Sequence, residues 1–155
     1  MTSAPVSQNQ QSILWKYFIA AAVSLVGLAD AIYLTVEHIT GATLRCSIIS
    51  GCSEVLSSRY AQVGPFPLAA IGAAAYFVVF SLAILAAFGH RVAILPLKIL
   101  LALMLVTTLW LLYLQAFVIH HFCQYCLLSA AVTMTLAAIV FLLGSRTAKA
   151  GAPAN

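Results

Sequence analysis

Charged residues are scarce in this sequence. Only 6% of the 155 residues are Asp, Glu, Lys or Arg, against roughly 25% in soluble domains, while 64% are hydrophobic. Water is therefore excluded as the main solvent of the fold. The net charge of +4 is spread along the chain and forms no basic run, so we expect no nucleic-acid partner.

The apolar residues fall into four long segments, 15–36, 66–88, 94–119 and 122–143. Roughly 20 apolar residues cross a bilayer as a helix, and such a helix pairs its own backbone polar groups. Short links make successive helices antiparallel. The sequence thus predicts an all-α integral membrane protein, a four-helix transmembrane bundle with an extracytoplasmic loop between its first two helices.

Three regions are expected along the chain: a cytoplasmic tail at 1–13, a four-helix membrane domain at 14–145 and a second cytoplasmic tail at 146–155. We expect the first segment to be a membrane helix and not a cleaved signal peptide. Its apolar core exceeds the usual length of about 7 to 15 residues, and no charge precedes Lys16.

Positive charge predicts the orientation, because cytoplasmic loops of membrane proteins carry an excess of Lys and Arg. Arg45 and Arg59 fall between the first two helices. The other Lys and Arg residues fall at the opposite end of the bundle, namely Lys16, Arg91, Lys98, Arg146 and Lys149. Both termini are therefore predicted to be cytoplasmic.

The chain has only four cysteines, and all of them fall at the predicted extracytoplasmic end, where disulfides persist. Cys46 and Cys52 lie in the loop, and Cys123 and Cys126 lie where the fourth helix begins. A helix N-terminus stabilises a thiolate, and a bridge between residues three apart on a helix is distorted and reducible. We predict that the loop cysteines form a water-accessible pair and that Cys123 and Cys126 form a redox-active pair near the bilayer. Together the two pairs would connect an aqueous dithiol to a lipid-soluble acceptor by thiol exchange.

The spacing alone leaves two alternatives open. Two static disulfides would staple the outer face of a non-catalytic membrane protein. A zinc site made by the cysteines, or including His120 and His121, is disfavoured because neither Cys-x5-Cys nor a lone Cys-x2-Cys is a standard paired-ligand spacing. No metal is expected.

Three stretches resemble one known family: GLADAIYLT at 27–35, GCSEVLSSR at 51–59 and FCQYCLLSA at 122–130. Over residues 15–143 the chain resembles the vitamin K epoxide reductase (VKOR) family in its bacterial, DsbB-like form, with the same order of helices and cysteines. The predicted membrane domain is then VKOR-like.

The resemblance implies a bundle around a quinone, either ubiquinone or menaquinone. Cys123 and Cys126 would be the pair facing it, with Cys126 reacting with the quinone and Cys123 exchanging with the loop. Cys46 and Cys52 would be the shuttle pair. Ser58 matches the family's loop serine, whose hydroxyl lies near the quinone site.

The resemblance also implies a location and a partner. The chain would be a multi-pass protein of the bacterial inner (cell) membrane that reoxidises a periplasmic DsbA-like thioredoxin-fold protein, supporting disulfide bond formation. We expect this donor to be a separate protein. Ala130 and Leu68 stand where vertebrate members have a tyrosine and an asparagine that binds the substrate carbonyl. A quinone-dependent thiol-disulfide oxidoreductase is therefore expected, and a reductase of vitamin K epoxide or quinone is the alternative.

Two further residues are candidates for binding the quinone. Asp30 lies about seven residues from the outer end of the first helix, hence roughly 10 Å deep at 1.5 Å per residue. An intramembrane acid is a functional hypothesis by default, although it can also serve packing alone. Tyr76 is a candidate for lining the pocket, with ordinary packing as its alternative.

Overall fold

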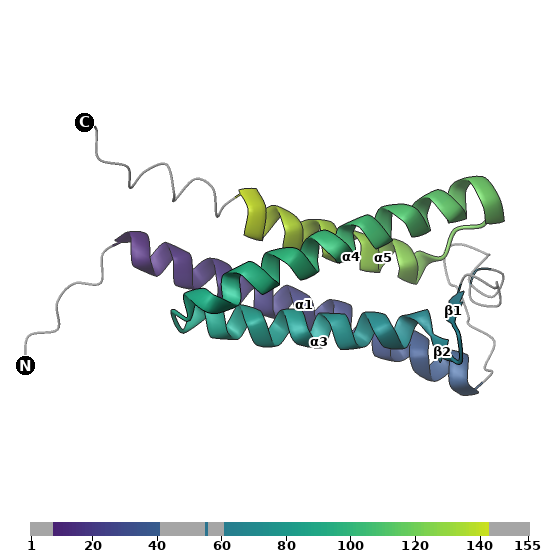
Figure 1. Cartoon of the computed structure of the whole chain (residues 1–155). Coiled ribbons are helices and arrows are strands. Elements are labelled where there is room, and N and C mark those ends of the chain that lie inside the picture. The colour runs from purple at the N-terminus through teal and green to yellow at the C-terminus, as the bar shows by residue number, and fades with distance from the viewer. Residues whose placement is uncertain (1–7, 41–54, 56–60, 143–155) are drawn as a thin grey trace, which may run out of the picture.

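The structure of the chain, a computed structural model, describes residues 8–40, 55 and 61–142. Four helices are long and apolar enough to cross a membrane, over Leu14–Thr40, Leu68–Ala87, Arg91–Ile119 and Gln124–Phe141. They lie lengthwise beside one another in a bundle (Figure 1). The predicted four-helix transmembrane bundle is confirmed.

The main helices are α1 (Gln8–Thr40), α3 (Leu68–Ala87), α4 (Ile94–Leu114) and α5 (Gln124–Ala137). Helix α1 begins within the segment predicted as the first tail. Three shorter helical segments and two strands complete the described elements, namely the 3-10 helix η2 (Arg91–Ala93), the π-helices η3 (Gln115–Ile119) and η4 (Ala138–Leu142), and β1 (Gln62–Val63) and β2 (Phe66–Pro67).

Helix α3 ends in a Schellman motif that turns the chain toward α4. His90 N–H donates to the Leu85 carbonyl at 3.1 Å, and Gly89 N–H donates to the Ala86 carbonyl at 3.1 Å. These bonds satisfy two carbonyl groups that the helix end leaves open. Gly89 has φ 88°, a left-handed conformation that glycine adopts without steric cost.

The strands β1 and β2 form a short antiparallel hairpin that leads into α3. Gln62 pairs with Pro67, and Gly64, with φ 63°, lies in the turn. Gln62 Nε2 lies 3.1 Å from His38 Nε2, a hydrogen bond that ties the hairpin to the last turns of α1. The hairpin thus closes one end of the bundle between α1 and α3 (Figure 1).

Small residues bring the helices together. Ala20, Ala21 and Ala83 are buried in the core, as is typical of membrane helices that associate through close van der Waals contact. A close approach occurs at Gly27 of α1, where an added Cβ atom would lie 2.6 Å from Cζ of the Tyr76 ring on α3. The absence of a side chain at Gly27 therefore makes room for Tyr76.

We expect Gly27→Ala to destabilise the bundle, because its methyl group would overlap the Tyr76 ring. Overpacking costs typically about 1 to 3 kcal/mol, which exceeds the roughly 1 kcal/mol that alanine gains over glycine within a helix. The free energy of unfolding in mixed detergent micelles measures the change. Gly72→Ala is the matched control, since a Cβ atom there meets nothing within 4 Å. Equal stability of the two variants would show that the contact is not tight.

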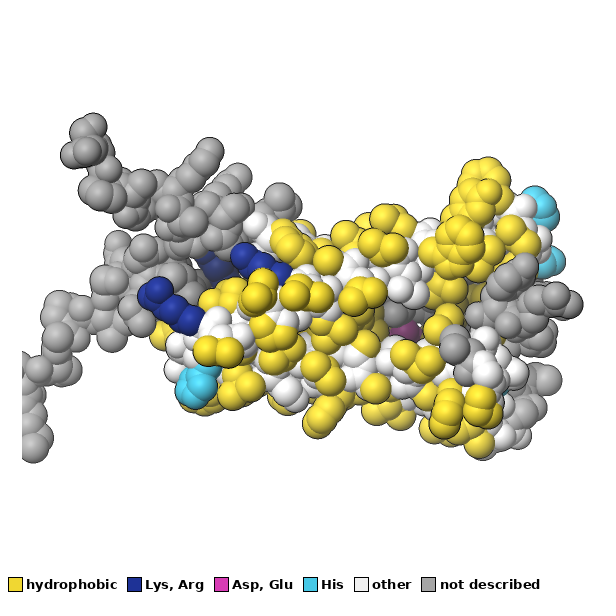
Figure 2. All heavy atoms as spheres, in the orientation of Figure 1, with side chains coloured by type: hydrophobic (Ala, Val, Ile, Leu, Met, Phe, Trp, Pro, Cys, Tyr) yellow, Lys and Arg dark blue, Asp and Glu magenta, His cyan; other side chains and the backbone are white. Residues whose placement is uncertain are grey.

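Apolar side chains cover much of the face of the bundle that Figure 2 shows, and many large hydrophobic side chains of the described helices are exposed, as expected of a lipid-facing surface. Large exposed side chains include Trp110 and Phe117, whose rings flank that of Tyr113 at centroid distances of 5.9 and 5.0 Å. Lys16 and Lys98 lie near the beginnings of α1 and α4, and basic side chains gather at one end of the molecule (Figure 2). The bundle thus has an apolar belt with a basic end.

Candidate redox site

The Cys-x2-Cys element lies where the chain turns from η3 into α5. His120 ends η3 with φ 57°, a left-handed conformation in which histidine is enriched among residues other than glycine. Cys123 then has an extended backbone, with φ −99° and ψ 120°, and caps α5. Its carbonyl accepts from Leu127 N–H at 3.0 Å, which begins the helix. Cys126 consequently lies in the first turn of α5.

Gln115 holds Cys123 from the neighbouring helix. Its Oε1 atom accepts the Cys123 N–H at 3.0 Å, and both residues are buried. Gln115 is the first residue of the π-helix η3, a wide turn that is frequent at functional sites. A backbone donor at a helix N-terminus is thereby satisfied by a side chain, and the cysteine backbone is fixed in place.

The two thiols are free and interact directly. The Cys126 thiol donates a hydrogen bond to the Cys123 sulfur, and this bond does most to lower the pKa of Cys123, to about 7. Burial opposes the shift, while backbone N–H groups of Cys126 and Tyr125 reinforce it. This arrangement makes Cys123 the more nucleophilic thiol near neutral pH.

Cys123 is covered on its other side. It has no exposed surface and forms a small buried cluster with Val55, which belongs to the segment between α1 and the hairpin. Ile119 and Tyr125 pack against the same cluster, and the Tyr125 ring lies 5.3 Å from the Tyr33 ring of α1. A large molecule therefore has no direct access to the Cys123 sulfur.

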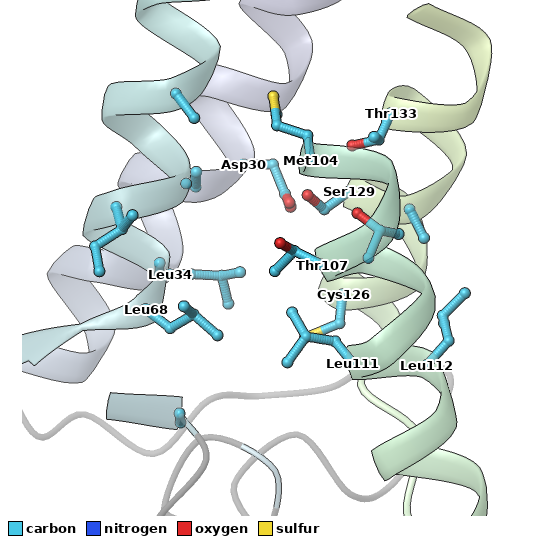
Figure 3. A pocket seen from close by; sticks show the side chains of 18 of the residues that line it. Asp30, Leu34, Leu68, Met104, Thr107, Leu111, Leu112, Cys126, Ser129 and Thr133 are labelled. Atoms are coloured by element: carbon cyan, nitrogen blue, oxygen red, sulfur yellow. The ribbon is translucent and has the colours of Figure 1, made fainter. Parts of the chain in front are cut away.

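Cys126 instead borders a cavity of about 360 Å³ between the helices (Figure 3). Most of the wall is apolar, with Leu34, Leu68 and Leu111 on different helices. The polar side chains that reach the cavity include Asp30, Tyr76, Gln115, Cys126, Ser129 and Thr133. A mostly apolar pocket with a few converging polar groups is typical of a small-molecule site.

Tyr76 forms the centre of a hydroxyl cluster between α3 and α5. Its hydroxyl group donates to the Ser129 carbonyl at 2.9 Å and lies 2.8 Å from both Ser129 Oγ and Thr133 Oγ1. Tyr76 is only 1% exposed. These bonds fix its ring against Gly27 and fix the register of α3 on α5.

Asp30 is the acidic residue among the described residues that line the cavity. It is 8% exposed, and its Oδ2 atom has no hydrogen-bond partner. The carboxyl group points toward the space between the helices, near Ser129 (Figure 3). It is close enough to interact electrostatically with both Cys126 and Tyr76. Among the described residues, no three His, Cys, Asp or Glu side chains gather as a metal site.

The structure brings four of the predicted site residues to this region, Cys123, Cys126, Asp30 and Tyr76, and all but Cys123 line the cavity. The other predicted site residues lie outside the described residues, namely Cys46, Cys52 and Ser58.

Three residues of the site were not anticipated from the sequence. Ser129 and Thr133 follow Cys126 by three and seven positions, which places all three on one helix face, so helical spacing carried a signal for them. Gln115 stood out only as a polar residue in an apolar run. Its contact with Cys123 depends on the π-helix and the left-handed turn, which no local pattern indicated.

We expect alkylation of Cys123 by iodoacetamide to depend on pH with a midpoint near 7, because only the thiolate reacts. A lowered pKa means that the thiolate is present above this value and is lost as the pH falls below it. In Cys126→Ala the midpoint should move to higher pH, since the largest cause of the lowering is removed. Mass spectrometry of the alkylated peptide measures the fraction. Thr135→Ala, an exposed change on the same helix, is the control and should leave the midpoint unchanged. An unshifted midpoint in Cys126→Ala would refute the thiol-thiol hydrogen bond.

No curated protein sequence matches the chain. The model of the vitamin K epoxide reductase family matches residues 18–141. Members of that family are membrane oxidoreductases that link thiol-disulfide chemistry to quinone-type compounds and use redox partners of the thioredoxin kind. With most of its length matched and four helices able to cross a membrane, this chain belongs to the vitamin K epoxide reductase family.

Proposed function

We propose that the protein reoxidises an extracytoplasmic DsbA-like thioredoxin-fold protein and passes the electrons through two cysteine pairs to a membrane quinone, so supporting disulfide bond formation. The observation that carries this proposal is the asymmetry of the Cys-x2-Cys pair. Cys126 borders the apolar cavity, whereas Cys123 is hydrogen-bonded to it and lies behind Val55. The Cys126 thiol is thus on the side of the cavity that we propose for the lipid-soluble acceptor, and Cys123 is on the side of Val55, which follows the loop cysteines in sequence.

The cavity fits a quinone head group, either ubiquinone or menaquinone. Its volume of about 360 Å³ is within the usual range of roughly 300 to 1,000 Å³ for small-molecule sites. Its apolar wall suits a quinone ring, and the unpartnered Oδ2 of Asp30 offers a polar contact inside it. Asp30, with Tyr76 and Ser58 as further candidates, would hold the head group. A bound quinone supplies an acceptor for two electrons and two protons.

The loop cysteines complete the proposed route. Cys46 and Cys52 act as a shuttle pair that takes electrons from the partner and delivers them to Cys123. In sequence, Cys52 precedes Val55 by three residues, which limits their Cα separation to about 11 Å. Val55 itself contacts Cys123. Chain connectivity therefore keeps the shuttle cysteine within short reach of the sulfur that it must attack.

The orientation follows from charge. Lys16 lies in the first half of α1, Arg91 in η2 and Lys98 in the opening turns of α4. These positions are away from the beginning of α5, where Cys123 and Cys126 lie. By the positive-inside rule we infer that the basic end is cytoplasmic and that the site lies on the extracytoplasmic side of a bacterial inner membrane. Disulfide exchange with a periplasmic partner requires this side.

Quinone reduction suits this cavity better than epoxide reduction. Leu68 and Ala130, the positions where vertebrate members carry an asparagine and a tyrosine, both line the cavity here. Their apolar side chains have no hydrogen-bond donor. The polar contacts of the cavity come from other residues, including Asp30.

The test uses the purified full chain with a reduced, folded thioredoxin-fold protein as donor and a short-chain ubiquinone or menaquinone as acceptor. We expect the loss of quinone absorbance to match the oxidation of donor thiols one disulfide to one quinone, and vitamin K epoxide to be reduced far more slowly. Oxidation of the donor without quinone reduction, or preference for the epoxide, would overturn the proposal.

A further inference from the structure

Asp30 is an acidic residue buried in mostly apolar surroundings, and this burial costs free energy. An uncompensated charge in apolar surroundings is strongly unfavourable, and a buried polar atom without a partner costs free energy in either protonation state. Asp30 Oδ2 has no partner, although the hydroxyl groups of Ser129 and Thr133 each bond to that of Tyr76 nearby. The hydroxyl cluster satisfies itself and leaves the carboxyl group directed into the cavity (Figure 3).

We propose that Asp30 is the proton donor to the oxygen of the quinone bound in this cavity. This inference rests on the proposed function and assigns to Asp30 a chemical step beyond binding. A neutral carboxyl group carries one O–H donor, so it first offers a hydrogen bond to a quinone oxygen and then transfers the proton.

The balance of the reaction calls for such a group. Forming the Cys123–Cys126 disulfide from one thiolate and one thiol breaks one S–H bond, makes one S–S bond and releases two electrons and one proton. Reducing a quinone to the hydroquinone consumes two electrons and two protons. The Cys126 thiol supplies one proton, and Asp30 supplies the other and becomes a carboxylate. The negative charge of the Cys123 thiolate is thereby passed to Asp30, so total charge is conserved.

Other cavity groups are poor alternatives as the second donor. The Tyr76 hydroxyl group already donates to the Ser129 carbonyl, and serine and threonine hydroxyl groups are far weaker acids than a carboxyl group. Asp30 is the one Asp or Glu among the described residues that line the cavity. Carboxyl groups are established general acids in enzymes.

Asp30 regains a proton from the aqueous end of the cavity. His38 lines the same cavity from the same helix, eight residues further on, which is about 12 Å along the axis. A hydrogen bond between His38 and Gln62 holds the His38 side chain beside the hairpin. The cavity thus extends from Asp30 to a titratable side chain at the end of α1, and a short chain of water molecules along it suffices for proton return.

The test compares two substitutions in the full chain in nanodiscs. Asp30→Asn keeps the shape and a hydrogen-bond donor but has no proton to transfer, whereas Asp30→Leu removes both. We expect Asp30→Asn to bind a short-chain ubiquinone within about threefold of the native affinity and to reduce it on the order of 100-fold more slowly in a single turnover. Asp30→Leu should lose both affinity and rate. Glu37→Gln, the other acid among the described residues, is the control and should change neither.

A measurement on the unsubstituted protein keeps the inference testable if the variants fail to fold. Dicyclohexylcarbodiimide modifies protonated carboxyl groups in apolar surroundings, and Asp30 is one of only three acidic residues. We expect modification of Asp30, detected by peptide mass spectrometry, and protection by the ubiquinone analogue. Modification without protection, or a normal rate in Asp30→Asn, would overturn the proton-donor role while leaving quinone reduction intact. Failure of the native protein to reduce any quinone would instead overturn the proposed function.

Discussion

Cys126→Ala should abolish quinone reduction with every donor, folded or small. Of the two cysteines that the structure describes, Cys126 is the one that borders the cavity, and its thiol also lowers the pKa of Cys123. Its loss removes both the sulfur nearest the acceptor and the partner for the disulfide. We expect the rate to fall to that of the uncatalysed reaction, as happens when one member of a catalytic unit is removed. Quinone absorbance in the presence of excess dithiol measures it.

Cys123→Ala should be equally inactive, for a different reason. The cavity-facing thiol remains, but no neighbouring thiolate is left to close a disulfide with it. Stability should change little, since removing one buried sulfur atom costs on the order of 1 kcal/mol and the helices are held in the membrane by their own apolar length. Native rates in both single variants would exclude this pair as the redox centre. Thr135→Ala controls for general damage to α5, because its hydroxyl group bonds only within its own helix, to the Ala131 carbonyl.

The bundle and the position of this pair were predictable because the bilayer imposes strong rules. A run of about 20 apolar residues has to be a helix, so four runs give four helices without any knowledge of their packing. The link before Cys123 then puts the Cys-x2-Cys element at a helix start. The distance of Asp30 from the helix end was underestimated, because α1 continues to Thr40, ten residues beyond Asp30 and about 15 Å along the axis.

The contacts that shape the site were not predictable in the same way. They join residues far apart in sequence, as in the fit of Tyr76 against Gly27 and the bond from Cys123 to Gln115. The Gln115 contact also needs a π-helix and a left-handed His120, and neither has a reliable local signature. Apolar composition specifies that the segments are membrane helices, but packing between individual side chains decides how the helices associate and which cavity remains between them.

Replacing both loop cysteines, with Cys46→Ser and Cys52→Ser, should separate large donors from small ones. We expect oxidation of a folded thioredoxin-fold donor to fall to background, because Cys123 has no exposed surface and lies behind Val55. Thiol exchange requires approach along the S–S axis, and a folded protein cannot reach a disulfide buried in this cluster. Dithiothreitol is small enough to enter, so partial activity with it should remain.

The control for this comparison is the rate of quinone reduction with dithiothreitol in the same variant, which reports whether Cys123, Cys126 and the cavity are intact. Equal losses with both donors would mean that the loop cysteines only staple or cover the site. No loss with either would mean that electrons enter at Cys123 directly. Adding Val55→Ala to the double variant sharpens the test, because it trims the side chain that covers Cys123. If access limits the rate, dithiothreitol should react faster in this triple variant, while the folded donor, still unable to approach the buried sulfur, should remain at background.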